Sequence, residues 1–148
     1  TKKPAYMGHA PDIRLPPPAV SLVSESFSTE GTRKLRFKIE STRGASRMRV
    51  DLYALQPPTN VFIDDKRLCD LEEKRTFFYS ILPNEPFELL LEIASGPLEI
   101  RLTDTSYEFP KVAGIFPRPF YMTRQSNTIT VGGIFESDTT SVTKVFKF

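Results

Sequence analysis

The sequence has 148 residues, of which 39% are hydrophobic and 26% are charged, so it is long enough for one globular domain with one core. Its single cysteine, Cys69, excludes an internal disulfide, and no run of about 18 apolar residues is present to span a membrane. The net charge of +2 conceals a separation, because residues 1–50 are basic and residues 61–110 are acidic. Such a separation concerns the surfaces that meet partners and not the fold.

The first 18 residues predict an extended linker. Three consecutive prolines, Pro16 to Pro18, favour polyproline geometry and exclude a helix. No signal peptide is visible at Thr1, and the abrupt start is what we expect of a fragment excised from a longer protein. We therefore predict a linker over 1–18 and a single domain over 19–148.

From Ala19 onward the apolar residues alternate with polar ones. In 33–41 and 47–55 every second residue is apolar, and 87–94 repeats the pattern. A period of two is typical of half-buried antiparallel strands. Further strands are predicted over 60–64, 75–82, 98–104, 127–135 and 141–148.

The connections between these strands are short. The loop "STRGAS", with Gly44, predicts a hairpin that pairs 33–41 with 47–55. Only "KRLCDLEEK", 66–74, favours a helical turn. Eight or nine short strands with frequent turn signals predict an all-β fold, an antiparallel β-sandwich of immunoglobulin-like or jelly-roll-like type.

Catalytic and metal-binding patterns are weak in this sequence. The only histidine, His9, falls in the linker, so a Ser-His-Asp or Cys-His arrangement has no base. His9 and Cys69 lie 60 residues apart and do not match the spacing of a zinc site. We expect Cys69 to be a small, partly buried hydrophobic residue and expect no cofactor or metal in this chain.

Two groups of carboxylates have a functional and a structural interpretation. A calcium site would need a D-x-D-x-D-G spacing that the first group lacks, so a solvated turn is the better interpretation. Glu88 and Glu92 share one strand face, where an exposed surface is favoured over a glycosidase pair. The first group comprises Asp64, Asp65, Asp70, Glu72 and Glu73.

A basic face is predicted on the first hairpin. If Leu35 and Met48 face the core, the cations of both strands project from the opposite side. Such a face can contact anionic lipid headgroups, whereas nucleic acid is disfavoured because no stacking aromatic residues interleave there. An ordinary solvated face is the alternative. The predicted face consists of Lys34, Arg36, Lys38, Arg47 and Arg49.

Four stretches resemble one known family. "APDIRLPPPAVSLVSESFSTEGTRKLRFKIESTRGASRMRVDL" resembles its P-x-V-x-V opening, and "ASGPLEIRLTDTSYEFP" resembles its G-P-L-x-x-R-x-x-D-x-S-Y-G-L-P signature. "FPRPFYM" and "SDTTSVTKVFKF" resemble its P-x-R-P-x-x-M and closing D-x-T-x-V-x-x-x-F stretches. Glu108 departs from the Gly of that pattern. The chain thus resembles the C-terminal soluble domain of multi-pass membrane zinc exopeptidases, metallopeptidase family twenty-eight, which includes the endoplasmic reticulum metallopeptidase type and bacterial relatives.

The resemblance implies a division of labour. In such proteins an upstream domain binds zinc and cleaves peptides, membrane helices follow, and the C-terminal domain is non-catalytic. This chain would then lie on the extracytoplasmic side of a membrane, in the periplasm or the lumen, and its partners would be the parent's own peptidase and membrane domains. None of the family's zinc ligands maps onto this chain. Two alternatives stay open: a freestanding module that binds carbohydrate or protein, and an independent hydrolase, which the residue inventory disfavours.

Two further segments carry candidate residues. In "TDTSYEFP" we interpret Asp104, Ser106 and Tyr107 as a structural corner, where Asx and Ser turns satisfy backbone donors and the tyrosine is buried; a ligand-contacting loop is the alternative. The Pro-rich stretch 108–124 holds more apolar area than a loop leaves in water. Either all of it covers the sandwich, or some of its residues form an exposed docking anchor. The candidate anchor consists of Phe116, Arg118, Phe120 and Tyr121.

Overall fold

The computed structural model describes residues 14–68, 75–80, 85–106, 128–130, 133–135 and 140–148. All regular secondary structure in these ranges is β-strand, as the alternating sequence predicts. The strands are β1 (Ala19–Phe27), β2 (Thr32–Glu40), β3 (Arg47–Ala54), β4 (Asn60–Ile63), β5 (Lys66–Arg67), β6 (Thr76–Ser80), β7 (Phe87–Ala94), β8 (Leu98–Ser106), β9 (Thr128–Thr130), β10 (Gly133–Phe135) and β11 (Thr140–Lys147).

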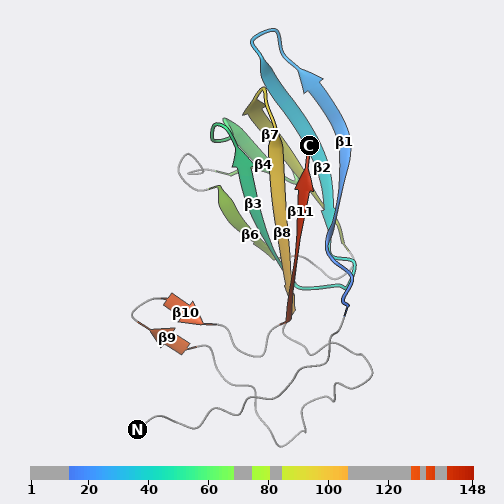
Figure 1. Ribbon diagram of the computed structural model, residues 1–148, viewed down its shortest axis with the longest axis vertical. Coiled ribbons are helices and arrows are strands. Elements are labelled where there is room, and N and C mark those ends of the chain that lie inside the picture. The colour runs from blue at the N-terminus through green and yellow to red at the C-terminus, as the bar shows by residue number, and fades with distance from the viewer. Residues whose placement is uncertain (1–13, 69–74, 81–84, 107–127, 131–132, 136–139) are drawn as a thin grey trace, which may run out of the picture.

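Nine of these strands form two antiparallel sheets that face each other (Figure 1). The first sheet has the order β1-β2-β7-β4-β5 and the second has the order β11-β8-β3-β6. The predicted antiparallel β-sandwich, with about nine strands, is confirmed. Strands β9 and β10 pair with each other in a small separate sheet, so the single strand predicted over 127–135 is two strands.

The core lies between the two sheets and follows the alternation of the sequence. On β2 and β7 every second side chain is buried, as it is on β3 and β8 of the opposite sheet. Burial of an apolar side chain contributes about 1.5–3 kcal/mol, which makes this layer the main source of stability. The fully buried larger side chains are Leu35, Phe37, Ile39, Met48, Leu52, Phe87, Leu89, Leu91, Ile93, Leu98, Ile100 and Leu102.

The predicted hairpin between β2 and β3 is wrong. Strand β2 pairs with β1 and β7, whereas β3 pairs with β6 and β8 in the other sheet. The loop 41–46 therefore crosses from one sheet to the other. A period of two requires only that one face of each strand be buried, and a crossing between sheets meets that requirement as well as a hairpin does.

The strand order is close to that of immunoglobulin sandwiches but differs at one point. Pairing of β2 with β7, and the order β11-β8-β3, match the B–E and G–F–C neighbours of that fold. After β3, however, the chain visits β4 and β5 in the first sheet before it returns to β6 beside β3. Here the position beside β7 is filled first, by β4, and the position beside β3 is filled afterwards, by β6. In immunoglobulin variable domains the chain fills the position beside the equivalent of β3 first.

A two-residue turn joins β4 and β5. Asp64 and Asp65 both have positive φ, at 46° and 64°, and they lie between the paired residues Ile63 and Lys66. This is the geometry of a type I′ turn, whose twist suits a hairpin. The predicted helical turn at 66–74 therefore begins as strand, and residues 69–74 lie outside the described ranges.

Candidate functional site

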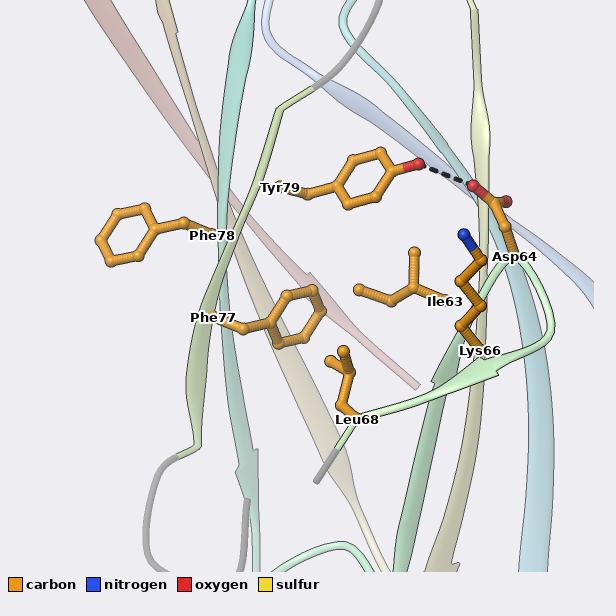
Figure 2. A pocket seen from close by; sticks show the side chains of 7 residues that line it. All are labelled: Ile63, Asp64, Lys66, Leu68, Phe77, Phe78 and Tyr79. Carbon is orange, nitrogen blue, oxygen red and sulfur yellow. Dashed lines mark hydrogen bonds between the residues drawn. The ribbon is translucent and has the colours of Figure 1, made fainter. Parts of the chain in front are cut away.

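A pocket of about 210 Å³ opens at one edge of the sandwich (Figure 2). The β4–β5 hairpin supplies one wall from the first sheet, and β6 supplies the other wall from the second. Figure 2 shows Phe77 and Tyr79 directed toward the hairpin, whereas Phe78 points away from the other side chains. The lining residues are Ile63, Asp64, Lys66, Leu68, Phe77, Phe78 and Tyr79.

Asp64 is held from three directions. Its backbone N–H donates to the carbonyl of Glu88 at 3.0 Å, and its Oδ1 accepts from the Glu88 backbone N–H at 2.9 Å. Its Oδ2 accepts from the hydroxyl of Tyr79 at 2.7 Å, a bond that crosses from one sheet to the other (Figure 2). Aspartate tolerates the left-handed conformation better than most residues, and these bonds fix it there.

The Tyr79 hydroxyl is a donor and stays protonated near neutral pH. Its hydrogen bond to Asp64, together with burial and the negative charges of Asp64 and Glu85, raises the pKa of Tyr79. Loss of the proton would place a phenolate against a carboxylate, which the electrostatics oppose. The ring itself packs on Phe87, with centroids 4.4 Å apart.

These groups favour binding over catalysis at the pocket. Its volume is below the 300–1,000 Å³ that is typical of small-molecule sites, so it suits one apolar side chain or a small fragment. The Asp64 carboxylate is already engaged by two donors, and the raised pKa of Tyr79 makes it a poor general acid or base at neutral pH.

A buried ion pair lies where the crossing loop meets β8. The Asp104 side chain is 0% exposed, and its Oδ1 lies 2.8 Å from Nη2 and 2.9 Å from Nε of Arg43. Its Oδ2 accepts from the hydroxyl of Ser41 at 2.6 Å, and the same hydroxyl oxygen accepts the Ala45 backbone N–H at 3.0 Å. Arg43 thus supplies the positive charge that a buried carboxylate requires.

The same arginine also reaches β8 and β11. It donates to Oγ of Ser106 at 3.0 Å, to the carbonyl of Asp104 at 3.0 Å and to the carbonyl of Thr140 at 2.7 Å. We call Ser41, Arg43, Asp104 and Ser106 the crossover clamp. The clamp ties the loop 41–46, which links the two sheets, to two strands of the second sheet.

The crossover clamp changes the interpretation of the predicted corner. Asp104 and Ser106 do not leave the sheet in Asx and Ser turns, because β8 continues through Ser106 and pairs with Thr140 of β11. Both side chains instead bind Arg43. Tyr107 lies outside the described residues.

The predicted basic face does not exist as one surface. Lys34, Arg36 and Lys38 lie on the outward face of the first sheet, whereas Arg47 and Arg49 belong to β3 in the second sheet. The two groups separate because the loop 41–46 crosses between sheets instead of closing a hairpin.

Each group also has local partners. Lys34 lies 3.7 Å from Glu92, and Arg36 lies 3.0 Å from Glu88 across the β2–β7 pair. This confirms the predicted outward face for Glu88 and Glu92. On the second sheet, Arg49 pairs with Asp51 at 3.1 Å, and the Arg47 guanidinium lies 4.3 Å from the centroid of the Phe78 ring.

The candidate anchor residues Phe116, Arg118, Phe120 and Tyr121 lie outside the described residues, as do His9 and Cys69. Within the described ranges no group of three or more His, Cys, Asp or Glu is placed to hold a metal ion. The same ranges contain no helix long and apolar enough to cross a membrane.

Three residues at these sites were not predicted from sequence: Arg43, Asp64 as a bridge between sheets, and Tyr79. Arg43 had a detectable signal, because it lies in a loop of small residues where a long cation has no strand face to occupy. The partnership of Tyr79 with Asp64 had none, since it depends on which edge strands lie opposite each other. Comparisons with models of protein families, with curated proteins and with solved structures found no match.

Proposed function

We propose that this chain is a non-catalytic accessory domain of a membrane-anchored zinc exopeptidase, on the extracytoplasmic side of the membrane. Its role is to pack against the peptidase and membrane domains and to support substrate access or assembly. Zinc belongs to the peptidase domain of the parent in this proposal, and this chain contributes shape and contact surface.

One observation carries the proposal. Two stretches that belong to the family resemblance, "STRGA" and "RLTDTSY", meet in the crossover clamp through Arg43 and Asp104. Residues that match a family pattern and are used for a buried ion pair are the residues of a scaffold. The engaged carboxylate of Asp64 and the raised pKa of Tyr79 support the same conclusion for the pocket.

The first test is the coding sequence upstream of this chain. The proposal requires a zinc-exopeptidase domain followed by membrane helices, and any other arrangement contradicts it. The second test compares the intact protein with a form that lacks residues 19–148. We expect the intact protein to cleave aminoacyl-p-nitroanilides, and the truncated form to lose activity, membrane assembly or both. Full retention of both properties would contradict an accessory role.

A freestanding protein-binding module is the second candidate, and the pocket edge favours it. Phe78 is 56% exposed and carries Arg47 above its ring, and exposed aromatic and Arg residues are the preferred anchors of interfaces. Under this alternative Phe78→Ser abolishes capture of a partner and leaves the melting temperature within about 2–4 °C, since an exposed side chain contributes little to stability. Under the accessory proposal the same variant weakens association with the parent's own domains.

A further inference from the structure

The four edge strands of the sandwich differ in how well they resist pairing with another chain. Exposed edges are usually protected by shortness, by Lys or Pro, or by irregularity. Strand β5 has two residues, both cationic, and β6 has five residues. Strand β11 carries Lys144 and Lys147. Strand β1 has nine residues and contains no Lys, Arg or Pro.

Strand β1 also exposes apolar side chains. Seven consecutive residues from Ser21 are exposed, and Leu22, Val23 and Phe27 are 40%, 56% and 65% exposed. In Figure 1, β1 lies at the margin of the molecule with β2 as its hydrogen-bonded neighbour. Its single charge, Glu25, pairs with Arg33 of β2. Among the described edge strands, β1 is thus the longest and the one without Lys, Arg or Pro, and its protective features are the bulge between Leu22 and Ser24 and the inward-facing Glu25.

The two faces of β1 have different chemistry. Residues opposite each other on antiparallel strands share a face, so Leu22, Glu25 and Phe27 lie on the inward face, opposite Phe37, Leu35 and Arg33 respectively. Ser21, Ser24 and Ser26 lie on the outward face, opposite Lys38, Arg36 and Lys34 respectively.

The outward face thus carries a strip of serines and then a strip of cations. The cationic strip ends at Glu40, and the carboxylates of Glu88 and Glu92 lie one strand further on, in β7. A strand added to β1 would lie about 10 Å from β2. A Lys or Arg side chain from β2 and a Glu side chain from the added strand can together span this distance, because the serines of β1 between them are small. Lys34 and Arg36 keep 51% and 40% of their side chains exposed and so have capacity for a further partner.

We propose that the edge of β1 binds an extended partner segment in which acidic and apolar side chains alternate. The segment adds as a strand, with backbone hydrogen bonds to β1. Its carboxylates point outward to Lys34, Arg36 and Lys38, and its apolar side chains point inward to Leu22 and Phe27. This inference is independent of the proposed function, because it rests on the edge and its charges alone.

A second copy of the chain fits this edge poorly. Antiparallel pairing of two β1 strands would bring serines, and no carboxylate, to the serine strip of the first copy. The edge therefore favours a different chain of acidic character over self-association.

The test uses the 148-residue chain and a labelled nine-residue peptide of alternating valine and glutamate, with binding followed by fluorescence anisotropy. The control peptide has lysine in place of glutamate. Because exposed ion pairs are each worth a few-fold in affinity, we expect the glutamate peptide to bind at least about 10-fold more tightly, and the difference to shrink as salt is added. Equal affinity for the two peptides would overturn the proposal.

Two variants with the same charge change locate the site. Lys38→Glu should lower the affinity for the glutamate peptide by about 3- to 10-fold, because one attraction is lost and one repulsion is added. Lys147→Glu on β11 should change that affinity by less than about 2-fold. Circular dichroism melts check that both variants are folded. Equal losses in the two variants would overturn the proposal, since they would indicate a general response to net charge.

Hydrogen exchange of the free chain identifies the edge itself. The amides of β1 that point away from β2 should exchange rapidly and become protected when the glutamate peptide binds. Protection already present in the free chain would show that the edge is occupied and would refute the proposal. A dimer by sedimentation, abolished by Leu22→Lys, would refute it in favour of self-association.

Discussion

Replacement of Arg43 by methionine should be the most damaging single change among the described polar residues. The variant keeps most of the side-chain volume but removes the cation from Asp104, whose side chain is 0% exposed. It also removes the donors for the carbonyls of Asp104 and Thr140 and leaves Ser41 as the donor to the carboxylate. Breaking a buried ion pair from one side costs about 3–5 kcal/mol.

The assay is equilibrium unfolding in urea. Because the sequence contains no Trp, far-ultraviolet circular dichroism is the appropriate signal. For a chain of this size, a loss of about 3–5 kcal/mol corresponds to a decrease in melting temperature of about 6–20 °C. The matched control is Arg101→Met on β8, which removes a half-exposed ion pair with Glu99 at 3.8 Å and a contact with the Tyr53 ring at 5.1 Å, and which should cost about 1 kcal/mol or less.

A double variant tests the mechanism as well as the size of the effect. If an unpaired buried charge is the cause, Arg43→Met combined with Asp104→Leu should be at least about 1 kcal/mol more stable than the sum of the two single losses predicts. Additive losses, or a cost below about 1 kcal/mol for Arg43→Met, would refute the reasoning that this pair holds the crossing loop.

Three other outcomes are expected. Tyr79→Phe should lower the free energy of unfolding by about 0.5–1 kcal/mol, because the bond to Asp64 is lost at a partly exposed site; an unchanged urea midpoint would contradict this. The pKa of Tyr79 is raised in the folded state, so the stability that its hydroxyl contributes is complete below the unfolded-state pKa and is lost as pH rises through the folded-state pKa. The wild type should therefore lose stability relative to Tyr79→Phe above about pH 10. Parallel pH profiles of the two proteins would show that the hydroxyl is not coupled to Asp64. Gly44→Ala should cost about 1–2 kcal/mol because Gly44 has a φ of 68°, whereas a neutral result would mean that the loop 41–46 relaxes freely.

The sequence was sufficient to predict most of the strands but not their neighbours. Strands β2, β3, β7 and β8 follow from the alternation of apolar and polar residues, because the buried side chains lie on one face of each strand, with Asp51 of β3 as the exception. The pairing of β2 with β7, about 50 residues later, leaves no local pattern. The six-residue loop 41–46 has turn chemistry that suits a hairpin and a crossing equally, so the choice depends on long-range burial.

The candidate sites show the same limit. The outward positions of Glu88 and Glu92 were predictable because the apolar residues Phe87, Leu89, Leu91 and Ile93 take the alternate positions of β7 and are buried. The partner of Asp104 was not, because Arg43 reaches it from a loop that is 61 residues away in sequence. A surface that is inferred from two strands is wrong when their predicted pairing is wrong. The five cations were placed on one face because β2 and β3 were predicted to pair.

The two proposals meet at the start of the sandwich. Under the accessory-domain proposal the parent's other domains precede this chain, and the polypeptide enters the fold through Pro17, whose carbonyl accepts a bond from the Thr42 hydroxyl at 2.8 Å. The first element after that point is β1, the edge strand of the first sheet. A short tether gives a neighbouring segment a millimolar effective concentration at that edge, so even a weak strand addition would be occupied in the intact protein. The glutamate peptide should therefore bind the isolated chain and compete poorly in the intact protein if the natural partner is the parent itself. Equal binding in both contexts would identify the β1 edge as a site for a separate chain.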